Sequence, residues 1–282
     1  MKNILILIPV YNDWESLKKL LDEINKLIKD INQVKFKCTI IDDGSSITKP
    51  NLEKPSNFTN FKVISMKENK GHARCNAFGL IYSLKHEKFD FIILMDGDGE
   101  DRPEEIEKLV LKTLENNSKS VVAKRVKRSE NIFFRTLYQI HKVITFVFTG
   151  NLINFGNYSC LTKNDVLKLS KKKSLWRSFS GSVKKNIKNL ESIRSERGKR
   201  YFGPSKMSLL KLIIHSLSIM SVFKLQLVLR SILFIFLSIY LGQFSNFVSI
   251  FLILGLNLFM CSIFIIWIVD LKRKYEYSED DI

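Results

Sequence analysis

Acidic side chains follow short apolar runs in the first hundred residues. Asp42 and Asp43 end one run, and Asp96 and Asp98 follow a later one. Asp13 comes soon after the first run of all. If these runs are parallel strands, their carboxyl ends meet at one edge of a sheet, where open α/β folds bind ligands. Carboxylates crowded there would repel one another unless a cation such as Mg²⁺ or Mn²⁺ joins them.

The Asp96-Gly97-Asp98 triplet suits metal binding by its geometry. In an extended segment alternate side chains point the same way, so both carboxylates could face one ion that in turn holds a diphosphate. Taken alone, the triplet is a weak signal, because acidic loops after strands are common. Asp42-Asp43-Gly44-Ser45 could equally be an ordinary turn with a helix cap. The joint pattern is more specific than either part.

Short apolar runs alternate with helix-period stripes up to about residue 125. The predicted strands are 4–8, 38–41, 61–66, 91–95 and 120–123. The predicted helices are 17–28, 73–84 and 103–114. Asn12, followed three residues later by Glu15, resembles a capping box at the first helix start. This alternation predicts an α/β fold with a mostly parallel sheet covered on both faces.

Four strings carry a family resemblance: IPVYNDWESL, IIDDGSS, NKGHARCNAFGL and ILMDGDGEDRPEEI. In order and spacing they resemble the family 2 glycosyltransferases. Within that family they are similar to the polyprenyl-phosphate group, which includes dolichyl-phosphate mannose synthase. The resemblance implies a GT-A fold, a nucleoside-diphosphate-sugar donor and a divalent metal, Mg²⁺ or Mn²⁺. It is strong over residues 1 to about 125 and looser over 130–210.

The resemblance also implies roles for individual residues. Asp98 would be the principal metal ligand, and Asp96 would bind metal, ribose and diphosphate with it. Asp42 would hold the base or ribose. The remaining residues expected at the nucleotide-sugar are Pro9, Tyr11, Asp13, Asp43, Asn69, Gly71 and His72. Asp13 stands where the family usually has Glu.

Two later segments extend the match. Residues 155–159 resemble a segment that often reads Gly-Asp-Phe-Arg in relatives, and Asn157 and Ser159 depart from it by losing an acid and a base. A basic segment then resembles the one that precedes the membrane in relatives. Its candidates for binding an acceptor phosphate are Arg197, Arg200, Ser205 and Lys206. The alternative is generic positive charge near a membrane.

The C-terminal part of the sequence predicts membrane insertion. No charged residue and no His occurs over 231–269, which suits two crossings, expected over 223–242 and 247–269. Basic residues flank both ends, so the positive-inside rule places the catalytic domain and the C-terminus in the cytoplasm. The net charge of +17 then fits an anionic membrane surface, and no nucleic-acid motif accompanies it. The alternative is a buried hairpin in a soluble protein.

The expected domain plan follows from these patterns. Residues 1–207 form a GT-A domain, with a nucleotide-sugar half over 1–125 and an acceptor half over 126–207. Residues 208–222 form a juxtamembrane amphipathic helix, 223–269 the transmembrane hairpin, and 270–282 a cytoplasmic tail. A homo-oligomer is left open. Two spans are few for moving a lipid-linked sugar across a bilayer, which suggests a separate flippase.

The expected function is an inverting, membrane-anchored transfer of sugar to polyprenyl phosphate. A lipid phosphate is already ionised near neutral pH, so it needs little help from a base. If the acceptor is instead a glycan or lipid hydroxyl, a carboxylate base is required, and Glu100 or Asp101 is the candidate. A third reading is a catalytically weak membrane scaffold that keeps the fold, which the substitutions at Asn157 and Ser159 leave open.

Overall fold

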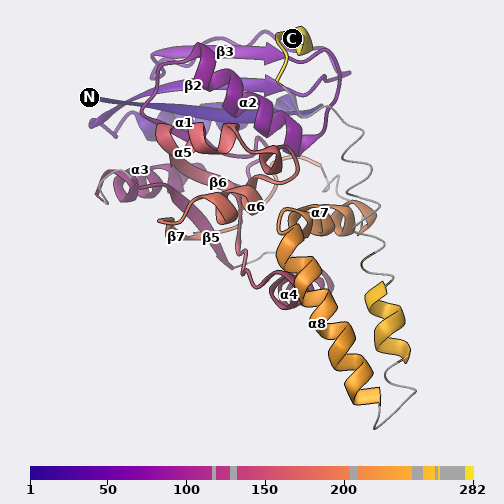
Figure 1. Cartoon of the computed structure of the whole chain (residues 1–282). Helices are drawn as coiled ribbons and strands as arrows, with labels where there is room; N and C mark the ends of the chain where they lie inside the picture. Colours follow the sequence, from indigo (N-terminus) through magenta and orange to yellow (C-terminus); the bar gives the residue numbers. More distant parts are fainter. Residues whose placement is uncertain (116–118, 128–131, 204–208, 243–249, 258–259, 261–276) are drawn as a thin grey trace. The chain divides into compact units, whose positions relative to one another are not determined.

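The computed structural model describes residues 1–282 except 116–118, 128–131, 204–208, 243–249, 258–259 and 261–276 (Figure 1). The chain divides into two compact units. Unit 1 contains Met1–Glu130, Asn154–Lys206 and Glu276–Ile282, and unit 2 contains Asn131–Ile153 and Met207–Tyr275. Residues 277–282, in the predicted cytoplasmic tail, therefore pack with unit 1.

Unit 1 is built on one sheet whose seven described strands run in the order β3-β2-β1-β4-β6-β5-β7. Pairing is parallel between β1 and its neighbours β2 and β4, between β2 and β3, and between β5 and β7, while β6 is antiparallel to β4 and β5. The predicted mostly parallel sheet is confirmed. The strands are β1 (Lys2–Val10), β2 (Val34–Asp42), β3 (Asn60–Ser65), β4 (Phe91–Leu94), β5 (Val121–Lys127), β6 (Phe155–Thr162) and β7 (Glu191–Glu196).

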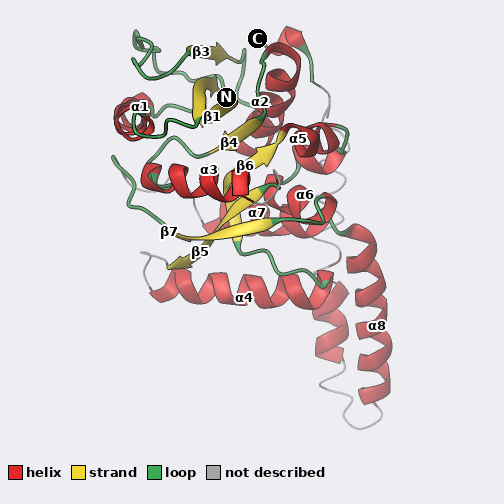
Figure 2. Ribbon diagram, turned by 90° about the vertical axis from the view of Figure 1, so that its left-hand side faces the viewer, coloured by secondary structure: helices red, strands yellow, loops and turns green. Residues whose placement is uncertain are grey.

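Helices cover both faces of this sheet. Figure 2 shows α1 and α3 on one side, and α2, α5 and α6 on the other. Their bounds are α1 (Trp14–Ile28), α2 (His72–His86), α3 (Ile106–Glu115), α5 (Lys163–Ser170) and α6 (Phe179–Asn186), with short 3-10 turns at η1 (Pro103–Glu105), η2 (Lys173–Trp176) and η3 (Glu279–Asp281).

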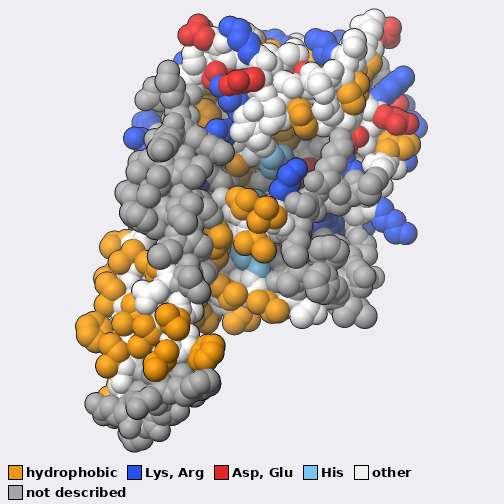
Figure 3. Space-filling view, turned by 90° about the vertical axis from the view of Figure 1, so that its right-hand side faces the viewer, with side chains coloured by type: hydrophobic (Ala, Val, Ile, Leu, Met, Phe, Trp, Pro, Cys, Tyr) orange, Lys and Arg blue, Asp and Glu red, His pale blue; other side chains and the backbone are white. Residues whose placement is uncertain are grey.

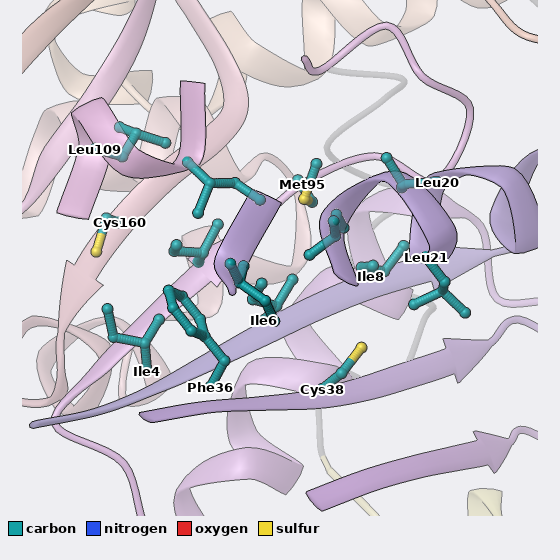
Figure 4. Packing of buried hydrophobic residues seen from close by; sticks show 14 of the residues in the cluster. Ile4, Ile6, Ile8, Leu20, Leu21, Phe36, Cys38, Met95, Leu109 and Cys160 are labelled. Carbon is teal, nitrogen blue, oxygen red and sulfur yellow. The ribbon is translucent and has the colours of Figure 1, made fainter. Parts of the chain in front are cut away.

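The buried strand β1 supplies both cores. Ile4, Ile6 and Ile8 point to the face covered by α1 and α3, where they join one cluster of buried side chains (Figure 4). Leu7 alternates to the other face. There a Cβ on Gly79 would lie 3.1 Å from Leu7 Cδ1, so the glycine lets α2 approach the sheet closely. A strand buried on both faces explains the continuous apolar run that the sequence shows.

The predicted capping box at the first helix is wrong. The N-cap of α1 is Asp13, and no side chain caps it. Asn12 instead adopts a left-handed backbone conformation, with φ of 51°. Its backbone N donates to Ser45 Oγ at 2.9 Å, and its Oδ1 accepts from Ile47 N at 3.0 Å. Asn12 therefore ties the end of β1 to the loop after β2, a tertiary contact that local spacing does not reveal.

Unit 2 contains α4 (Ile132–Thr149), α7 (Leu209–Ser221) and α8 (Lys224–Gly242), and residues 250–257 are also helical. Phe148 of α4 packs edge-to-face on Phe234 of α8 at 5.5 Å. Arg230 donates to Val147 O at 2.9 Å, near the end of α4. A cation at a helix C-terminus is stabilised by the unpaired carbonyls there, which explains a charge within this apolar helix.

Hydrophobic side chains gather on the surface of unit 2 (Figure 3). Among the helices that the structure describes, none is by itself both long and apolar enough to cross a bilayer. Leu210–Ser221 and Lys224–Leu237 meet that criterion as a pair, with a bend of 95° between them. Most of the second predicted span, 247–269, lies outside the described residues. The two-span hairpin therefore stays a prediction.

Candidate active site

The parallel strands bring the predicted acidic residues to one edge of unit 1. In register, Val10 of β1 lies beside Asp42 of β2, and Leu7 of β1 lies beside Leu94 of β4. The segments that follow these strands therefore leave the sheet at the same edge. This places Asp13, Asp42–Asp43 and Asp96–Asp98 together, as the sequence predicts.

The two carboxylates at the end of β2 are held by backbone amides. Asp42 accepts from Ser45 N at 2.9 Å. Asp43 accepts from Lys70 N at 2.8 Å and from Gly71 N at 3.0 Å, which fixes the loop that leads into α2. Burial raises the pKa of Asp43 to about 6 despite these two bonds.

Asp96 lies at the meeting point of three elements. Its Oδ1 accepts from Asn157 Nδ2 at 3.1 Å and lies 3.4 Å from His72 Nε2. Asn157 Nδ2 lies 2.6 Å from His72 Nε2; an amide nitrogen can only donate, so this bond requires the His72 tautomer in which Nε2 carries no proton. His72 opens α2 and Asn157 is on β6, so Asp96 links both to the end of β4.

Each carboxylate oxygen of Asp98 accepts a hydrogen bond. Its Oδ1 accepts from Glu100 N at 3.0 Å, and its Oδ2 accepts from Arg200 Nη1 at 2.8 Å. Burial first, and then the negative charges of Asp96 and Glu100, raise the pKa of Asp98 to about 6. Such crowding of carboxylates is the electrostatic condition that a bound cation relieves.

The loop after β7, residues 197–203, closes over the acidic edge. Arg200 also forms an ion pair with Asp13, so that one guanidinium joins the segments after β1 and β4. Arg197 pairs with Glu100, with its Nε donating at 2.9 Å. Both arginines were expected at an acceptor phosphate, and in this structure both are bound to carboxylates of the site.

Backbone contacts and one aromatic ring hold this loop in place. Tyr201 N donates to Asp98 O at 3.0 Å, and Gly198 N donates to Glu100 O at 2.9 Å. The Tyr201 ring lies over Gly99, where an added Cβ would come within 2.5 Å of it. Gly99 also has φ of +88°, a conformation that other residues rarely adopt. This glycine therefore permits the loop to approach the Asp96–Asp98 segment.

Asp101 is buried, with 3% of its surface exposed. Its carboxylate accepts from Asp96 N at 2.9 Å and lies 3.4 Å from Arg125 Nη2. Burial, followed by the charge of Asp96, raises the pKa of Asp101 to about 7. These contacts describe a residue that positions the Asp96 backbone, whereas the sequence suggested it as a base.

The donor set fits a divalent cation only in part. Within the described residues, no group of three or more His, Cys, Asp or Glu side chains is arranged to hold a metal. Asp96 and Asp98 nevertheless supply two hard oxygen donors in a crowded, mostly buried setting. Mg²⁺ is commonly held by one or two carboxylates together with substrate phosphates and water. The pair therefore fits a metal whose remaining ligands come with the substrate.

The other predicted site residues are buried in β1, exposed at the rim or outside the described chain. Pro9 is buried one residue before the end of β1, beside Ile41. Tyr11 is 44% exposed, and Asn69 is exposed on the loop before α2. Ser205 and Lys206 lie outside the described residues, and their expected role at the acceptor phosphate stays a prediction.

Sequence reasoning missed Arg125 and Tyr201. Arg125 lies in β5, whose partner β6 was not predicted, so nothing placed it near Asp101. Tyr201 carries no motif, although it directly follows Arg200, which the resemblance did single out. The available signal was its position in the sequence: Tyr201 follows the cations Lys199 and Arg200 and precedes Gly203.

The fold matches the solved structures of two sugar-3-phosphoglycerate synthases. Mannosyl-3-phosphoglycerate synthase from Rubrobacter xylanophilus superposes with a TM-score of 0.58 and 15% identity, over 80% of this chain and 74% of that one. Glucosyl-3-phosphoglycerate synthase from Mycobacterium tuberculosis, solved with Mn²⁺, UDP-glucose and phosphoglyceric acid, gives 0.55 and 13%, over 80% of each chain. These likenesses confirm the expected GT-A fold.

Sequence comparison identifies the family to which the chain belongs, which the fold alone does not. Residues 5–179 match the model of glycosyl transferase family 2, and the protein belongs to that family. It is 27% identical to the undecaprenyl-phosphate 4-deoxy-4-formamido-L-arabinose transferase of Proteus mirabilis, over 74% of this chain. The chain spans 64% of the length of that relative. The predicted resemblance to polyprenyl-phosphate glycosyltransferases is thereby confirmed.

Proposed function

We propose that this protein transfers a sugar from a nucleotide-sugar to the phosphate of a polyprenyl phosphate. The observation that carries the proposal is the meeting of two kinds of group at one sheet edge. Asp96 and Asp98 suit a metal-bound diphosphate, and Arg197 and Arg200 reach the same place on the loop after β7. The relative from Proteus mirabilis, by its name, uses undecaprenyl phosphate, which supports the same class of acceptor.

The donor half of the site is formed by the segments after β1, β2 and β4. Asp42, Asp43 and His72 flank the expected nucleotide, together with Pro9, Tyr11, Asp13, Asn69 and Gly71. A divalent metal, Mg²⁺ or Mn²⁺, would be held by Asp96 and Asp98 and would neutralise charge on the leaving diphosphate. The Mn²⁺ in the mycobacterial glucosyltransferase structure supports this expectation without deciding between the two ions.

In the proposed reaction an oxygen of the lipid phosphate attacks the anomeric carbon. The new carbon–oxygen bond forms as the bond to the diphosphate oxygen breaks, and the electron pair leaves with the nucleoside diphosphate. In-line attack inverts the anomeric centre. Arg197 and Arg200 would release their carboxylate partners and bind the lipid phosphate, since guanidinium groups suit phosphate oxygens. Their contribution is to orient the nucleophile.

The contacts of two carboxylates favour an ionised acceptor over a hydroxyl. A hydroxyl acceptor needs a base within hydrogen-bonding reach. Glu100 is paired with Arg197, and Asp101 is buried against Arg125 and the Asp96 backbone. Neither carboxylate is presented to a substrate in this structure. A phosphate acceptor does not need either of them as a base.

We further propose that the protein is anchored in the membrane through unit 2. Three observations support this. Large apolar side chains are exposed along α8, the α7–α8 pair meets the length and hydropathy of a span, and residues on both sides of 207–275 belong to unit 1. A chain that leaves unit 1 and returns to it crosses a bilayer an even number of times, as a hairpin does. Oligomeric state and a separate flippase stay predictions.

Membranes containing the protein provide the test. They would be incubated with polyprenyl phosphate, Mn²⁺ or Mg²⁺ and a panel of radiolabelled nucleotide-sugars, with Asp98→Ala membranes alongside. Label entering the organic phase with the wild type and not with the variant supports the proposal and names the sugar. No labelled lipid with any donor, in a protein that binds nucleotide in a metal-dependent manner, overturns the proposed acceptor.

A further inference from the structure

Three side chains near residue 280 pack against α2 and the loop before it, and we call Tyr277, Glu279 and Asp281 the latch. They follow the predicted membrane segment in the chain, yet Glu276–Ile282 belongs to unit 1. The C-terminal end of the chain, in yellow, lies beside β3 and α2 (Figure 1). Neither the family match, which ends at residue 179, nor the predicted site includes this segment.

The first latch residue anchors the segment on α2. The Tyr277 ring stacks on Phe78 at 5.1 Å, and Lys85 Nζ lies 4.1 Å above it. Tyr277 OH is 3.2 Å from His86 Nε2. Burial raises the pKa of Tyr277 to about 12, so the phenol is neutral at physiological pH. Glu279 Oε1 forms an ion pair with Lys85 at 3.8 Å and lies 3.5 Å from His86 Nε2.

The last latch residue holds the loop before α2. Lys67 N donates to Asp281 O at 2.8 Å. Lys70 Nζ lies 3.1 Å from Asp281 Oδ1 and 2.8 Å from Glu68 Oε1. These two carboxylates, Glu68 first, raise the pKa of Lys70. One backbone bond and one ion pair therefore join the latch to residues 67–71.

The same loop is fixed from its other side by the end of β2. Lys70 N and Gly71 N donate to Asp43, as described above. An added Cβ on Gly44 would lie 2.5 Å from the Glu68 carbonyl carbon, so this glycine lets the loop lie directly against β2. The loop ends at His72, which reaches Asp96. It is thus clamped between the latch and the acidic edge.

We propose that the latch is a positioning element of the donor site: Tyr277 anchors the segment on α2, and Asp281 holds residues 67–71 in the conformation that receives the nucleotide. This inference rests on the proposed function, because it takes the donor nucleotide to bind beside that loop. Without the latch, the loop of residues 67–71 keeps its bonds to Asp43 but loses its contacts on the opposite side. The loop then samples more conformations, and nucleotide binding must order it.

The test compares the full chain with four variants in detergent. Deletion of 277–282 removes the latch, Asp281→Asn removes one charge, and Asp281→Glu restores that charge. Asp280→Asn is the matched control, because the Asp280 side chain bonds to Ser278 in its own turn. Calorimetry would measure the affinity for UDP and GDP with Mn²⁺. Hydrogen exchange would follow the amides of 67–71 without nucleotide.

Deletion is expected to weaken nucleotide binding about 10-fold and Asp281→Asn about 3-fold, in line with an ion pair of up to about 1 kcal/mol. Asp281→Glu and Asp280→Asn are expected to bind like the wild type. Amide exchange in 67–71 is expected to rise with the weakened variants. Unchanged exchange after deletion overturns the latch. A different result separates the latch from the proposed function. If the wild type binds no nucleotide but deletion still accelerates amide exchange in 67–71, the proposed function is wrong, while the latch is still shown to stabilise the loop.

Discussion

The carboxylates of the acidic edge are held in two different ways. Asp42 and Asp43 are bound by backbone amides, which a folded chain cannot easily withdraw. Asp13 and Glu100 are instead paired with arginines from the loop after β7, and Asp98 shares its second oxygen with one of them. Backbone partners make a fixed cradle, whereas side-chain partners can change. Under the proposed function, this difference separates the carboxylates that would contact the donor nucleotide from those whose arginine partners would move to the acceptor phosphate.

Removing the carboxylate at the centre of the rearranging part has the largest expected effect. Asp98→Asn keeps the shape but loses the charge that pairs with Arg200 and that would hold the proposed metal. We expect transfer to fall at least about 100-fold, the scale seen when one electrostatic stabiliser is lost. Initial rates with labelled donor would measure it, with the exposed Asp22→Asn as control. A variant that keeps more than a tenth of the activity with the same metal dependence would contradict the assignment.

Substitution of Gly99, which lies beneath the Tyr201 ring, tests what holds the loop of residues 197–203 in place. Gly99→Ala adds both backbone strain and a clash with the ring, so we expect unfolding to become easier by about 1–3 kcal/mol. Gly203→Ala is a matched control, because it shares a positive φ of +66° but nothing lies within 4 Å of its Cβ. Thermal unfolding in detergent would compare the two. Equal losses in both variants would show that the Tyr201 contact does not hold the loop.

Buried carboxylates of both kinds also make the stability of the fold depend on pH. Folding raises the pKa of Asp98 to about 6 and that of Asp101 to about 7, so the folded state binds protons more tightly than the unfolded state. Stability without metal should therefore rise as pH falls from about 7.5 to 5, by about 1–2 kcal/mol. Asp101→Asn should flatten this rise. A melting temperature that falls over the same range would refute it.

The smallest expected effect concerns competition between Arg200 and a metal ion for the carboxylate of Asp98. Without its guanidinium, Asp98 and Asp13 are uncompensated, so Arg200→Ala should bind Mn²⁺ more tightly in the absence of nucleotide. A gain of up to about 5-fold corresponds to one ion pair of about 1 kcal/mol. Electron paramagnetic resonance of free Mn²⁺ would measure it, and the exposed Arg194→Ala serves as control. Weaker or unchanged binding would mean that Arg200 does not compete with the ion.

The sequence predicts the buried central strands better than the strands and loop that carry the arginines, for physical reasons. Strands such as β1 are buried on both faces and read as apolar runs. Strand β7 reads ESIRSE at the sheet edge, and five of its six residues are exposed or half-exposed, so no apolar pattern reveals it. Strand β6 carries polar Asn157 into the site.

The contacts that complete the site are also too distant in sequence to predict from spacing. Arg200 lies 102 residues from Asp98, and the latch returns after the apolar segment. The resemblance singled out Arg200 but assigned it to the acceptor, and only the structure reveals its present partner. Asn12 was read as a local cap for the same reason, because spacing does not show its bonds to the loop after β2.

The central claim is that the acceptor is an ionised lipid phosphate, and one comparison tests it most directly. Purified protein with its preferred labelled donor would be given polyprenyl phosphate or the matching polyprenol, which differ only in the phosphate group. The account predicts label transfer to polyprenyl phosphate and none to polyprenol, because neither Glu100 nor Asp101 is placed to act as a base. Equal or greater transfer to polyprenol would contradict it.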